Sequence, residues 1–182
     1  MENLQEKTLK KEYVYEGKII KVRKDLAQMV DGLECDREVV EHPGGVGIAL
    51  EDEDGKFFFV KQYRYAQQEV TLEYPAGKRE SKEDDLLTAQ REIIEETGYE
   101  GTDWFYLGLM YPTPAYDNET IGLYYAKKGK FVGQNFDADE HIYVEKLSLD
   151  EITDKIVAGN VRDAKTIAMT MLVKENKAKG RI

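Results

Sequence analysis

The sequence predicts a mixed α+β fold, and three observations support this prediction. Between residues 14 and 73, short apolar stretches alternate with turn-forming residues, which is typical of β-strands. A helical stripe of apolar residues then runs from 84 to 97, and strand-like segments return after it. Two further helical segments are expected near the end of the chain. A β-rich core with one internal helix and two late helices predicts helices packed on a sheet.

Turn residues divide the first part of the chain into its predicted strands. Gly17 marks a bend, Asp31-Gly32 is a tight-turn pair, and the residues from Asp52 to Gly55 form a further turn. Pro75-Ala76-Gly77 is expected to be a turn at the end of this part. The predicted strands are 14–22, with the bend inside it, then 26–30, 35–41, 46–50, 57–63 and 70–73.

The internal helix is expected to span residues 84–97. Ser81 is interpreted as its N-cap, and Gly98 stands where a left-handed C-terminal cap belongs. At about 100° of rotation per residue, one side of this helix is apolar and is expected to pack on the sheet, and three glutamates fall on the other side. The apolar side holds Leu86, Ala89, Ile93, Ile94 and Thr97, and the acidic side holds Glu92, Glu95 and Glu96 next to Arg91.

The rest of the chain returns to strands and ends in helices. Strands are predicted at 104–111, 120–126 and 142–147. Helices are predicted at 149–158, where Gly159 ends the helix, and at 164–174. The lysine-rich end is expected to be a solvated tail that contains Lys174, Lys177, Lys179 and Arg181.

Composition excludes several classes of partner. The chain has 182 residues, with 26 Lys and Arg against 36 Asp and Glu, and its net charge of −10 disfavours nucleic acid and anionic lipid as partners. Cys35 is the only cysteine, which excludes an internal disulfide and a cysteine-based zinc site. No apolar run reaches the ~20 residues of a membrane-spanning helix, and the start shows no secretory signal. A cytoplasmic location is therefore expected.

Three glutamates crowd one side of the internal helix. Glu92 and Glu96 are four residues apart, which is a like-charge spacing that costs a helix about 0.3 kcal/mol. Carboxylates gathered in this way suit Mg²⁺ or Mn²⁺, because these hard cations prefer oxygen ligands. The alternative interpretation is a solvated acidic face without a ligand.

The spacing around these glutamates resembles the signature of a known family. The segments Gly77-Lys-Arg-Glu-Ser-Lys-Glu83 and Arg91-Glu-Ile-Ile-Glu-Glu96-Thr-Gly98 match every fixed position of the Nudix box. The chain thus resembles the Nudix hydrolases, which cleave nucleoside diphosphates linked to another group. The resemblance implies a Nudix-type α/β/α sandwich with a mixed central sheet and an N-terminal antiparallel β subdomain. It also implies two regions, a dimerising β-strand region over 1–42 and a Nudix hydrolase domain over 43–182.

The same resemblance implies a metal site. Glu92 and Glu96 are expected to bind a divalent cation, and the carbonyl of Ala76 is expected to add a third oxygen. The expected ion is Mg²⁺, with Mn²⁺ as the alternative. The cation would neutralise a pyrophosphate that the acidic chain would otherwise repel.

The family further implies residues that assist catalysis. Glu95 assists at the metal face, and Glu83 with Arg91 forms a supporting pair, for which a plain surface ion pair is the alternative. Residues 137–140 resemble the acidic loop that supplies the general base. Glu140 is the best match for that base, and Asp139 is the alternative.

Beyond the box, the chain resembles the ADP-ribose pyrophosphatase branch of the family. Glu73-Tyr-Pro-Ala-Gly77 is similar to the entry of that branch into the box, Pro114 stands where the branch has a proline, and residues 159–166 resemble its C-terminal helices. Ala115 departs from the branch, which has glycine after that proline. The departure keeps another nucleotide sugar, such as GDP-mannose, open as the substrate.

Four residues are expected to contact the substrate. Arg64 ends the strand motif Lys61-Gln-Tyr-Arg64, whose arginine contacts substrate in the family, and Arg37 is a second candidate. Pro114 and Glu119 are candidates in the loop between two later strands. His42 is expected to be a surface or strand-edge residue, because it lacks metal-ligand spacing.

Together these features predict an Mg²⁺-dependent pyrophosphohydrolase. The expected reaction splits ADP-ribose into AMP and ribose 5-phosphate, and the resemblance implies a homodimer whose N-terminal strands pack across the two-fold axis. The alternatives are the same hydrolysis on GDP-mannose or a non-catalytic Nudix protein that senses a nucleotide sugar. The complete box and the net charge both disfavour the sensing alternative.

Overall fold

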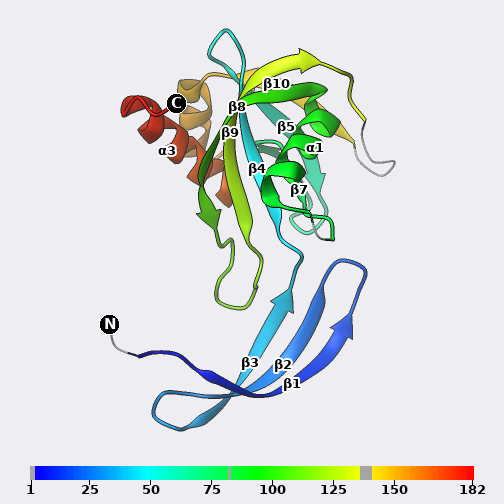
Figure 1. Cartoon of the computed structure of the whole chain (residues 1–182), viewed down its shortest axis with the longest axis vertical. Helices are drawn as coiled ribbons and strands as arrows, with labels where there is room; N and C mark the ends of the chain where they lie inside the picture. Colours follow the sequence, from blue (N-terminus) through cyan, green and yellow to red (C-terminus); the bar gives the residue numbers. More distant parts are fainter. Residues whose placement is uncertain (1–2, 82, 136–140) are drawn as a thin grey trace. The chain divides into compact units, whose positions relative to one another are not determined.

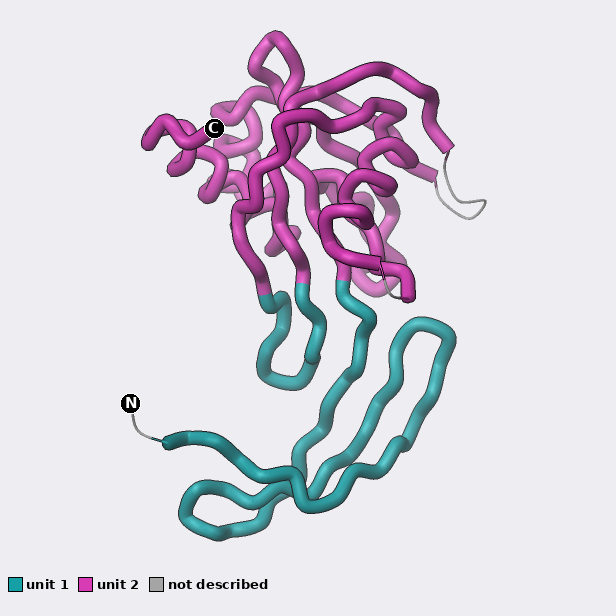
Figure 2. The backbone as a smooth tube through the Cα atoms, viewed as in Figure 1, with its two compact units in different colours: residues 1–44, 111–120 teal, residues 45–110, 121–182 magenta. Residues whose placement is uncertain are grey.

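The computed structural model describes residues 3–81, 83–135 and 141–182, which form two compact units. The first unit consists of residues 1–44 together with 111–120, and the second consists of 45–110 together with 121–182 (Figure 2). A loop that lies far along the sequence thus belongs to the unit of the N-terminal strands.

The first unit is built on a three-stranded antiparallel sheet. Its strands are β1 (Lys7–Glu16), β2 (Lys21–Gln28) and β3 (Glu34–Glu41), in that order across the sheet. Gly17 N donates to Ile20 O at 2.9 Å in the predicted bend, and Gly32 has a φ of 88° in the predicted turn. The loop 111–120 joins β3, because Val40 N donates to Tyr116 O at 2.7 Å.

The second unit contains a seven-stranded mixed sheet. Strands β10, β5, β4, β9 and β8 follow one another across it, while β6 pairs with β5 and β7 pairs with β4. The pairing of β4 with β9 is parallel, and the other pairings are antiparallel. The strands are β4 (Gly45–Glu51), β5 (Phe57–Arg64), β6 (Glu69–Glu73), β7 (Ala76–Lys78), β8 (Tyr99–Met110), β9 (Ile121–Phe131) and β10 (Ile142–Leu147).

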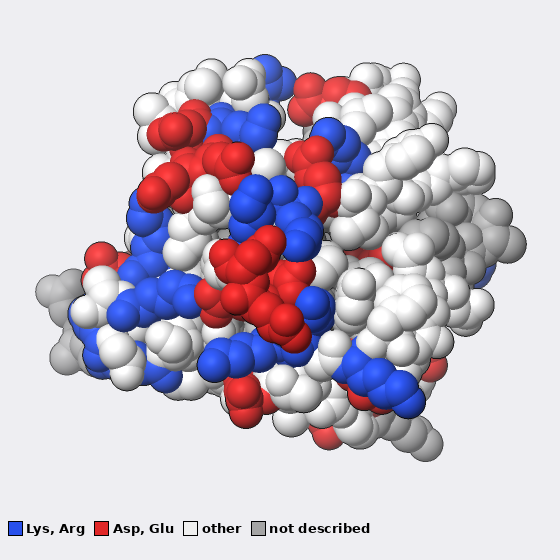
Figure 3. Space-filling model, turned by 90° about the horizontal axis from the view of Figure 1, so that it is seen from above, with Lys and Arg blue, Asp and Glu red and all other residues white. Residues whose placement is uncertain are grey.

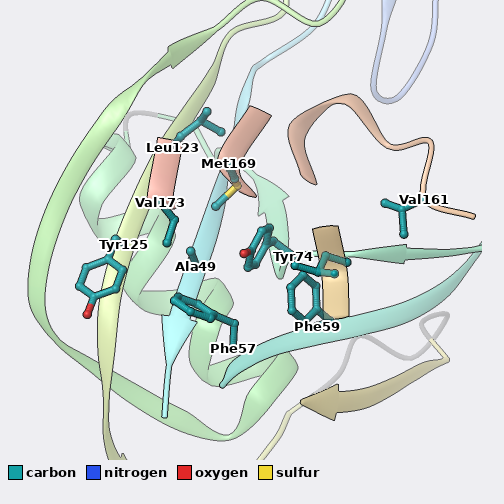
Figure 4. Packing of buried hydrophobic residues seen from close by; sticks show 10 residues of the cluster. Ala49, Phe57, Phe59, Tyr74, Leu123, Tyr125, Val161, Met169 and Val173 are labelled. Atoms are coloured by element: carbon teal, nitrogen blue, oxygen red, sulfur yellow. The ribbon is translucent and has the colours of Figure 1, made fainter. Parts of the chain in front are cut away.

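Helices cover both faces of this sheet, which confirms the predicted α/β/α sandwich (Figure 1). Helix α1 (Asp85–Thr97) buries Ala89 and Ile93 against one face. Helices α2 (Leu149–Val157) and α3 (Ala164–Ala178) lie on the other face. There, Met169 and Val173 of α3 pack against aromatic side chains of the sheet (Figure 4). None of the helices in the described residues is both long and apolar enough to span a bilayer.

A short strand replaces one predicted turn. Residues Ala76–Lys78 form β7, which pairs with the first residues of β4, and Ile48 N donates to Pro75 O at 2.8 Å. Strand β5 pairs with β4 only at the other end, where Glu51 faces Phe57. The first half of β4 therefore has an edge to which β7 can add. This pairing holds Gly77 beside α1, which the prediction of a plain turn did not include.

The lysine-rich end is not the predicted solvated tail. Helix α3 continues to Ala178, four residues beyond the predicted end, and it buries Val173 and Asn176. Lys177 Nζ lies 2.6 Å from Glu51 Oε1 and above the ring of Phe57. Apolar packing and this ion pair keep the last turns of α3 on the sheet, although many of their residues are charged.

Candidate active site

The ends of α1 are set by capping residues. Asp84, not Ser81, is the N-cap, because its side chain accepts from Leu87 N at 2.9 Å. Gly98 ends the helix in the left-handed region with a φ of 79°, as predicted, and its N–H donates to Ile94 O. The prediction of Ser81 was wrong because an aspartate nearer the helix also satisfies its first amides.

The buried side of α1 is rotated relative to the prediction. Leu86 is 37% exposed, whereas Glu96, which was placed on the solvent side, is only 4% exposed. Glu96 follows Ala89 by seven residues and Ile93 by three, so it shares their side of the helix. The sheet lies under Ala89 and Ile93, and this choice of packing face buries a glutamate.

Glu92 occupies a space that only glycine leaves open. A Cβ atom added to Gly77 would lie 1.7 Å from Glu92 Cδ and 2.0 Å from its Oε1. The carboxylate of Glu92 therefore lies directly on the backbone of β7. Any larger residue at 77 would displace it, which explains why the site needs a glycine at the start of the box segment.

Glu96 reaches the same strand one residue earlier. Ala76 N donates to Glu96 Oε2 at 3.1 Å, so β7 contacts the side chains of Glu92 and Glu96 through adjacent residues. Residue Ala76 also supplies the carbonyl that the sequence predicted as a metal ligand. Among the described residues, no three acidic, histidine or cysteine side chains are grouped closely enough to hold a metal by side chains alone.

Arg91 gathers the remaining carboxylates. Its Nη1 donates to Glu92 Oε1 at 2.8 Å and to Glu95 Oε2 at 2.9 Å. Its Nη2 donates to Glu83 Oε2 at 2.9 Å and to Lys78 O at 3.1 Å. We call Glu83, Glu92, Glu95 and Glu96 the acidic ridge.

These contacts shift the pKa values at the ridge. Hydrogen bonds from Arg91 lower the pKa of Glu83 to about 2, with further hydrogen bonds from Thr88 and the Glu80 amide. The hydrogen bond to Glu83 and the charges of the other glutamates raise the pKa of Arg91. Arg91 thus stays charged, and its ion pairs hold the side chains of Glu83, Glu92 and Glu95 in place.

Arg64 belongs to a second, buried group of charges. Its Nε and Nη2 donate to the two carboxylate oxygens of Glu73 at 2.8 and 2.7 Å. Lys165 of α3 also binds Glu73 Oε2, and its Nζ lies 3.0 Å from Asp163 Oδ2. We call Arg64, Glu73, Asp163 and Lys165 the buried ion cluster. The cluster joins three segments that the sequence analysis treated separately: residues 61–64, 73–77 and 159–166.

Lys165 had no assigned role in the sequence analysis. The segment that contains it, residues 159–166, resembled a family segment only as a pair of helices. An aspartate N-cap with a lysine two residues later, in the first turn of the helix, was a signal. Nothing local shows, however, that this lysine reaches a glutamate 92 residues away. The contact depends on how α3 crosses the sheet.

The other predicted site residues lie in the first unit or outside the described residues. Arg37 forms an exposed ion pair with Glu6, at 2.6 Å between Nη2 and Oε1. Pro114 lies in the loop 111–120, and Glu119 of the same loop has its Oε1 3.1 Å from Nδ1 of His42. His42 is accordingly a partly buried residue with an acidic neighbour. Glu140 and its alternative Asp139 lie outside the described residues.

Charged side chains also form ion pairs away from the ridge. On the face shown in Figure 3, acidic side chains lie next to basic ones. At the turn between β4 and β5, Asp52 binds Lys128 and Lys146, and these bonds lower its pKa to about 2 although burial alone would raise it. Asp52 thus has two lysine partners, whereas at the ridge three carboxylates share the single guanidinium of Arg91.

Two family models match the chain in succession. The model of the NUDIX domain matches residues 41–169, and the model of the nucleoside diphosphate sugar hydrolase N-terminal domain matches residues 6–40. The first of these matches covers more than half of the chain.

Curated relatives match most of the length on both sides. A methanol dehydrogenase activator of Bacillus methanolicus is 36% identical over 90% of this chain and 89% of its own length. An ADP-ribose pyrophosphatase of Bacillus subtilis (strain 168) is 32% identical over 91% of each chain. A GDP-mannose pyrophosphatase of Escherichia coli (strain SMS-3-5 / SECEC) is 28% identical over 73% of this chain and 74% of its own length.

A solved structure supports the same fold. A crystal structure described as an ADP compounds hydrolase superposes with a TM-score of 0.85 and covers all of both chains. Its sequence identity to this chain is 19%, so the likeness concerns the arrangement of strands and helices.

Proposed function

The chain belongs to the Nudix hydrolase family, and from this premise we propose that it hydrolyses the pyrophosphate bond of a nucleoside diphosphate sugar, with ADP-ribose as its preferred substrate. The products are AMP and ribose 5-phosphate. The observation on which the proposal rests is the packing of Glu92 onto Gly77 beside the contact of Glu96 with Ala76. This packing directs two carboxylates and one backbone residue to the same edge of β7.

The residues at β7 fit a divalent cation. Glu92, Glu96 and the carbonyl of Ala76 are all oxygen donors, which is the ligand type that Mg²⁺ and Mn²⁺ prefer. The space above Gly77, which a Cβ atom would fill, holds the carboxylate of Glu92 on the strand. Nudix hydrolases generally require a divalent metal, and Mg²⁺ is the ion proposed here. When bound, such an ion neutralises diphosphate oxygens and lowers the pKa of the attacking water.

The other residues position groups and move the proton. Arg91 holds Glu83, Glu92 and Glu95 in fixed orientations, so that the ridge is preorganised before substrate arrives. Glu140 is proposed to accept the proton of the attacking water as the new oxygen–phosphorus bond forms and the bond to the leaving phosphate breaks. Asp139 is the alternative base.

Four residues are proposed to contact the substrate. Arg64 is proposed to contact the diphosphate, because its side chain remains 41% exposed while two of its nitrogens bind Glu73. Arg37, Pro114 and Glu119 are proposed as further substrate contacts in the first unit. The ADP-ribose pyrophosphatase of Bacillus subtilis, which matches 91% of this chain, supports ADP-ribose as the first choice.

A substrate panel tests this proposal. Chromatographic assays that follow the nucleoside monophosphate released from ADP-ribose or GDP-mannose, each with Mg²⁺ and with excess chelator, should show turnover that needs the metal. We expect kcat/KM for ADP-ribose to exceed that for GDP-mannose by at least tenfold. A tenfold preference for GDP-mannose would support the alternative that the GDP-mannose pyrophosphatase relatives suggest. Absence of metal-dependent turnover on both would overturn the proposed function.

A second candidate function comes from the relative that is 36% identical. That protein is a methanol dehydrogenase activator, so activation of a dehydrogenase is a second role to test. The protein is added to a methanol dehydrogenase assay, either unchanged or as Glu96→Gln. Activation by the unchanged protein but not by Glu96→Gln would connect the two roles, because it would show that activation needs an active hydrolase site.

A homodimer in the cytoplasm is also part of the proposal. The sheet of the first unit leaves apolar side chains exposed on β1, including Tyr13, Val14 and Tyr15. Exposed apolar patches of this kind often mark protein interfaces. Light scattering coupled to size-exclusion chromatography should give twice the chain mass of 20.9 kDa. A single chain mass at micromolar concentration would contradict the dimer.

A further inference from the structure

The carboxylate of Glu73 is buried and shared by two cations. Its side chain is 2% exposed, and it accepts from Arg64, from Lys165 and from Thr71 Oγ1, the last at 2.5 Å. Burial alone would raise the pKa of Glu73, but the hydrogen bonds from Arg64 and the charge of Lys165 hold it well below its ordinary value. Glu73 is therefore a charged residue that needs both partners.

Lys165 is itself fixed in place by the start of α3. The side chain of Asp163 caps the helix by accepting from Thr166 N at 2.9 Å, and it also lies 3.0 Å from Lys165 Nζ. Thr166 Oγ1 accepts from Tyr74 N at 3.0 Å, which ties α3 to the residue after Glu73. Lys165 is 8% exposed, so its ammonium group has little access to water. Its position beside Glu73 is thus set by two packed segments, the start of α3 and residues 73–74.

Arg64 connects this cluster to the acidic ridge. Two of its nitrogens donate to Glu73, and its side chain is still 41% exposed. The hydrogen bonds to Glu73 raise the pKa of Arg64, and the charges of Asp163 and Glu96 add to this effect. Arg64 is therefore near enough to the ridge residue Glu96 to interact with it electrostatically.

The charge of Lys165 determines the balance of the buried ion cluster. With Lys165 present, two cations stand against two carboxylates in the cluster. Without it, Arg64 alone would neutralise Glu73 while Asp163 stayed nearby. The cluster would then carry an extra negative charge next to an anionic substrate, and Glu73 would hold Arg64 more strongly through the donors that remain.

We propose that Lys165 is a positioning residue, which by sharing Glu73 with Arg64 keeps the Arg64 guanidinium oriented toward the diphosphate of the substrate. The inference rests on the proposed function and deepens it. Lys165 touches no substrate, so it acts on binding through Arg64. Its loss should raise KM more than it lowers kcat, because the metal-binding residues at β7 stay intact.

The test compares Lys165→Met with a matched lysine of the same helix. With ADP-ribose and saturating Mg²⁺, Lys165→Met should raise KM about tenfold and leave kcat within about threefold. Lys165→Arg, which restores the charge, should bring KM back to within about threefold of the original value. The control is Lys177→Met, which also removes an ion pair of α3, in this case with the largely buried carboxylate of Glu51. This variant should leave KM unchanged.

A second comparison separates positioning from a loss of stability. In an Arg64→Ala background, Lys165→Met should add less than about twofold to KM, since the residue acts through Arg64. A full tenfold increase there would overturn the proposal, and so would an unchanged KM in the single variant. Lys165→Gln, which keeps a donor without the charge, takes its place if Lys165→Met does not fold. If the unchanged protein hydrolyses neither ADP-ribose nor GDP-mannose, that result contradicts the proposed function itself.

Discussion

The acidic ridge and the buried ion cluster lie in the same unit, but they combine charges in opposite ways. In the ridge, one guanidinium, that of Arg91, gathers three carboxylates with a fourth beside them. In the cluster, Arg64 and Lys165 stand against Glu73 and Asp163. The side chains of Glu83, Glu92 and Glu95 are partly buried, whereas Glu96 and Glu73 are almost fully buried.

The difference shows how the ratio of carboxylates to cations in a group of side chains relates to what the group does. A buried set of charges must be balanced, because the loss of hydration is costly unless each ion has a partner. A set with more carboxylates than cations costs folding energy, and such a cost is expected where a ligand of opposite charge binds. The cluster therefore fits a role in holding parts together, and the ridge fits a role in binding a cation.

The largest expected effect is the loss of turnover when a ridge carboxylate at β7 is neutralised. Glu96→Gln should lower kcat about a thousandfold, or about 4 kcal/mol, because a proposed metal ligand is lost. Its thermal stability without metal should stay the same or rise slightly, since Gln can still accept from Ala76 N. Glu53→Gln, at an exposed turn, serves as the control. Equal turnover in the two variants would reject the metal role of Glu96.

The cluster should show its effect mainly in stability. Glu73→Gln should lower the free energy of unfolding by about 3 kcal/mol, because Arg64 and Lys165 would lose their buried counter-charge. Glu95→Gln in the ridge should change it by only about 0.5 kcal/mol, since that ion pair is partly exposed. Denaturant unfolding of both variants measures the contrast. Similar losses in both would show that burial does not separate the two regions.

A somewhat smaller effect is expected from the glycine beneath the ridge. Gly77→Ala should lower kcat about a hundredfold, or about 2.7 kcal/mol, because the added Cβ displaces the Glu92 carboxylate. Added to Glu92→Ala, the same change should cost little more, because the displaced group is already gone. Steady-state kinetics of the single and double variants test this. Independent, additive losses would mean that Gly77 acts by some other route.

The smallest expected effect is a pH dependence of stability from the ridge. The pKa of Glu83 is lowered to about 2, so its contribution is complete above its unfolded pKa of about 4.3 and is lost as the pH falls toward 2. When the pH is lowered from 5 to 2.5, the free energy of unfolding should fall by about 1 kcal/mol less in Glu83→Gln than in the unchanged protein. Thermal unfolding across this range measures the two slopes. Parallel curves would show that Arg91 does not stabilise the Glu83 carboxylate.

Much of the fold and part of the site could be predicted because their signals are local. The strand alternation, the cap at Gly98 and the spacing of the box each depend on residues within a few turns of one another. The contact of Arg91 with Glu95 follows from the i, i+4 spacing of a helix. The metal, substrate and general-base roles, and the division of the chain after residue 42, stay predictions that await experiment.

By itself, the sequence determined the mixed α+β class and the helix that displays the glutamates, because periodicity specifies these features. The spacing of the box identified the family, and the resemblance implied the α/β/α sandwich. Only the tertiary structure decided that Glu96 is buried, that β7 adds to β4 beneath Glu92, and that Lys165 shares Glu73 with Arg64. The physical reason is that Glu96 with Ala76, β7 with β4, and Lys165 with Glu73 are contacts between residues 20 or more positions apart. Which of them meet depends on how sheet and helices pack, and no local pattern contains that information.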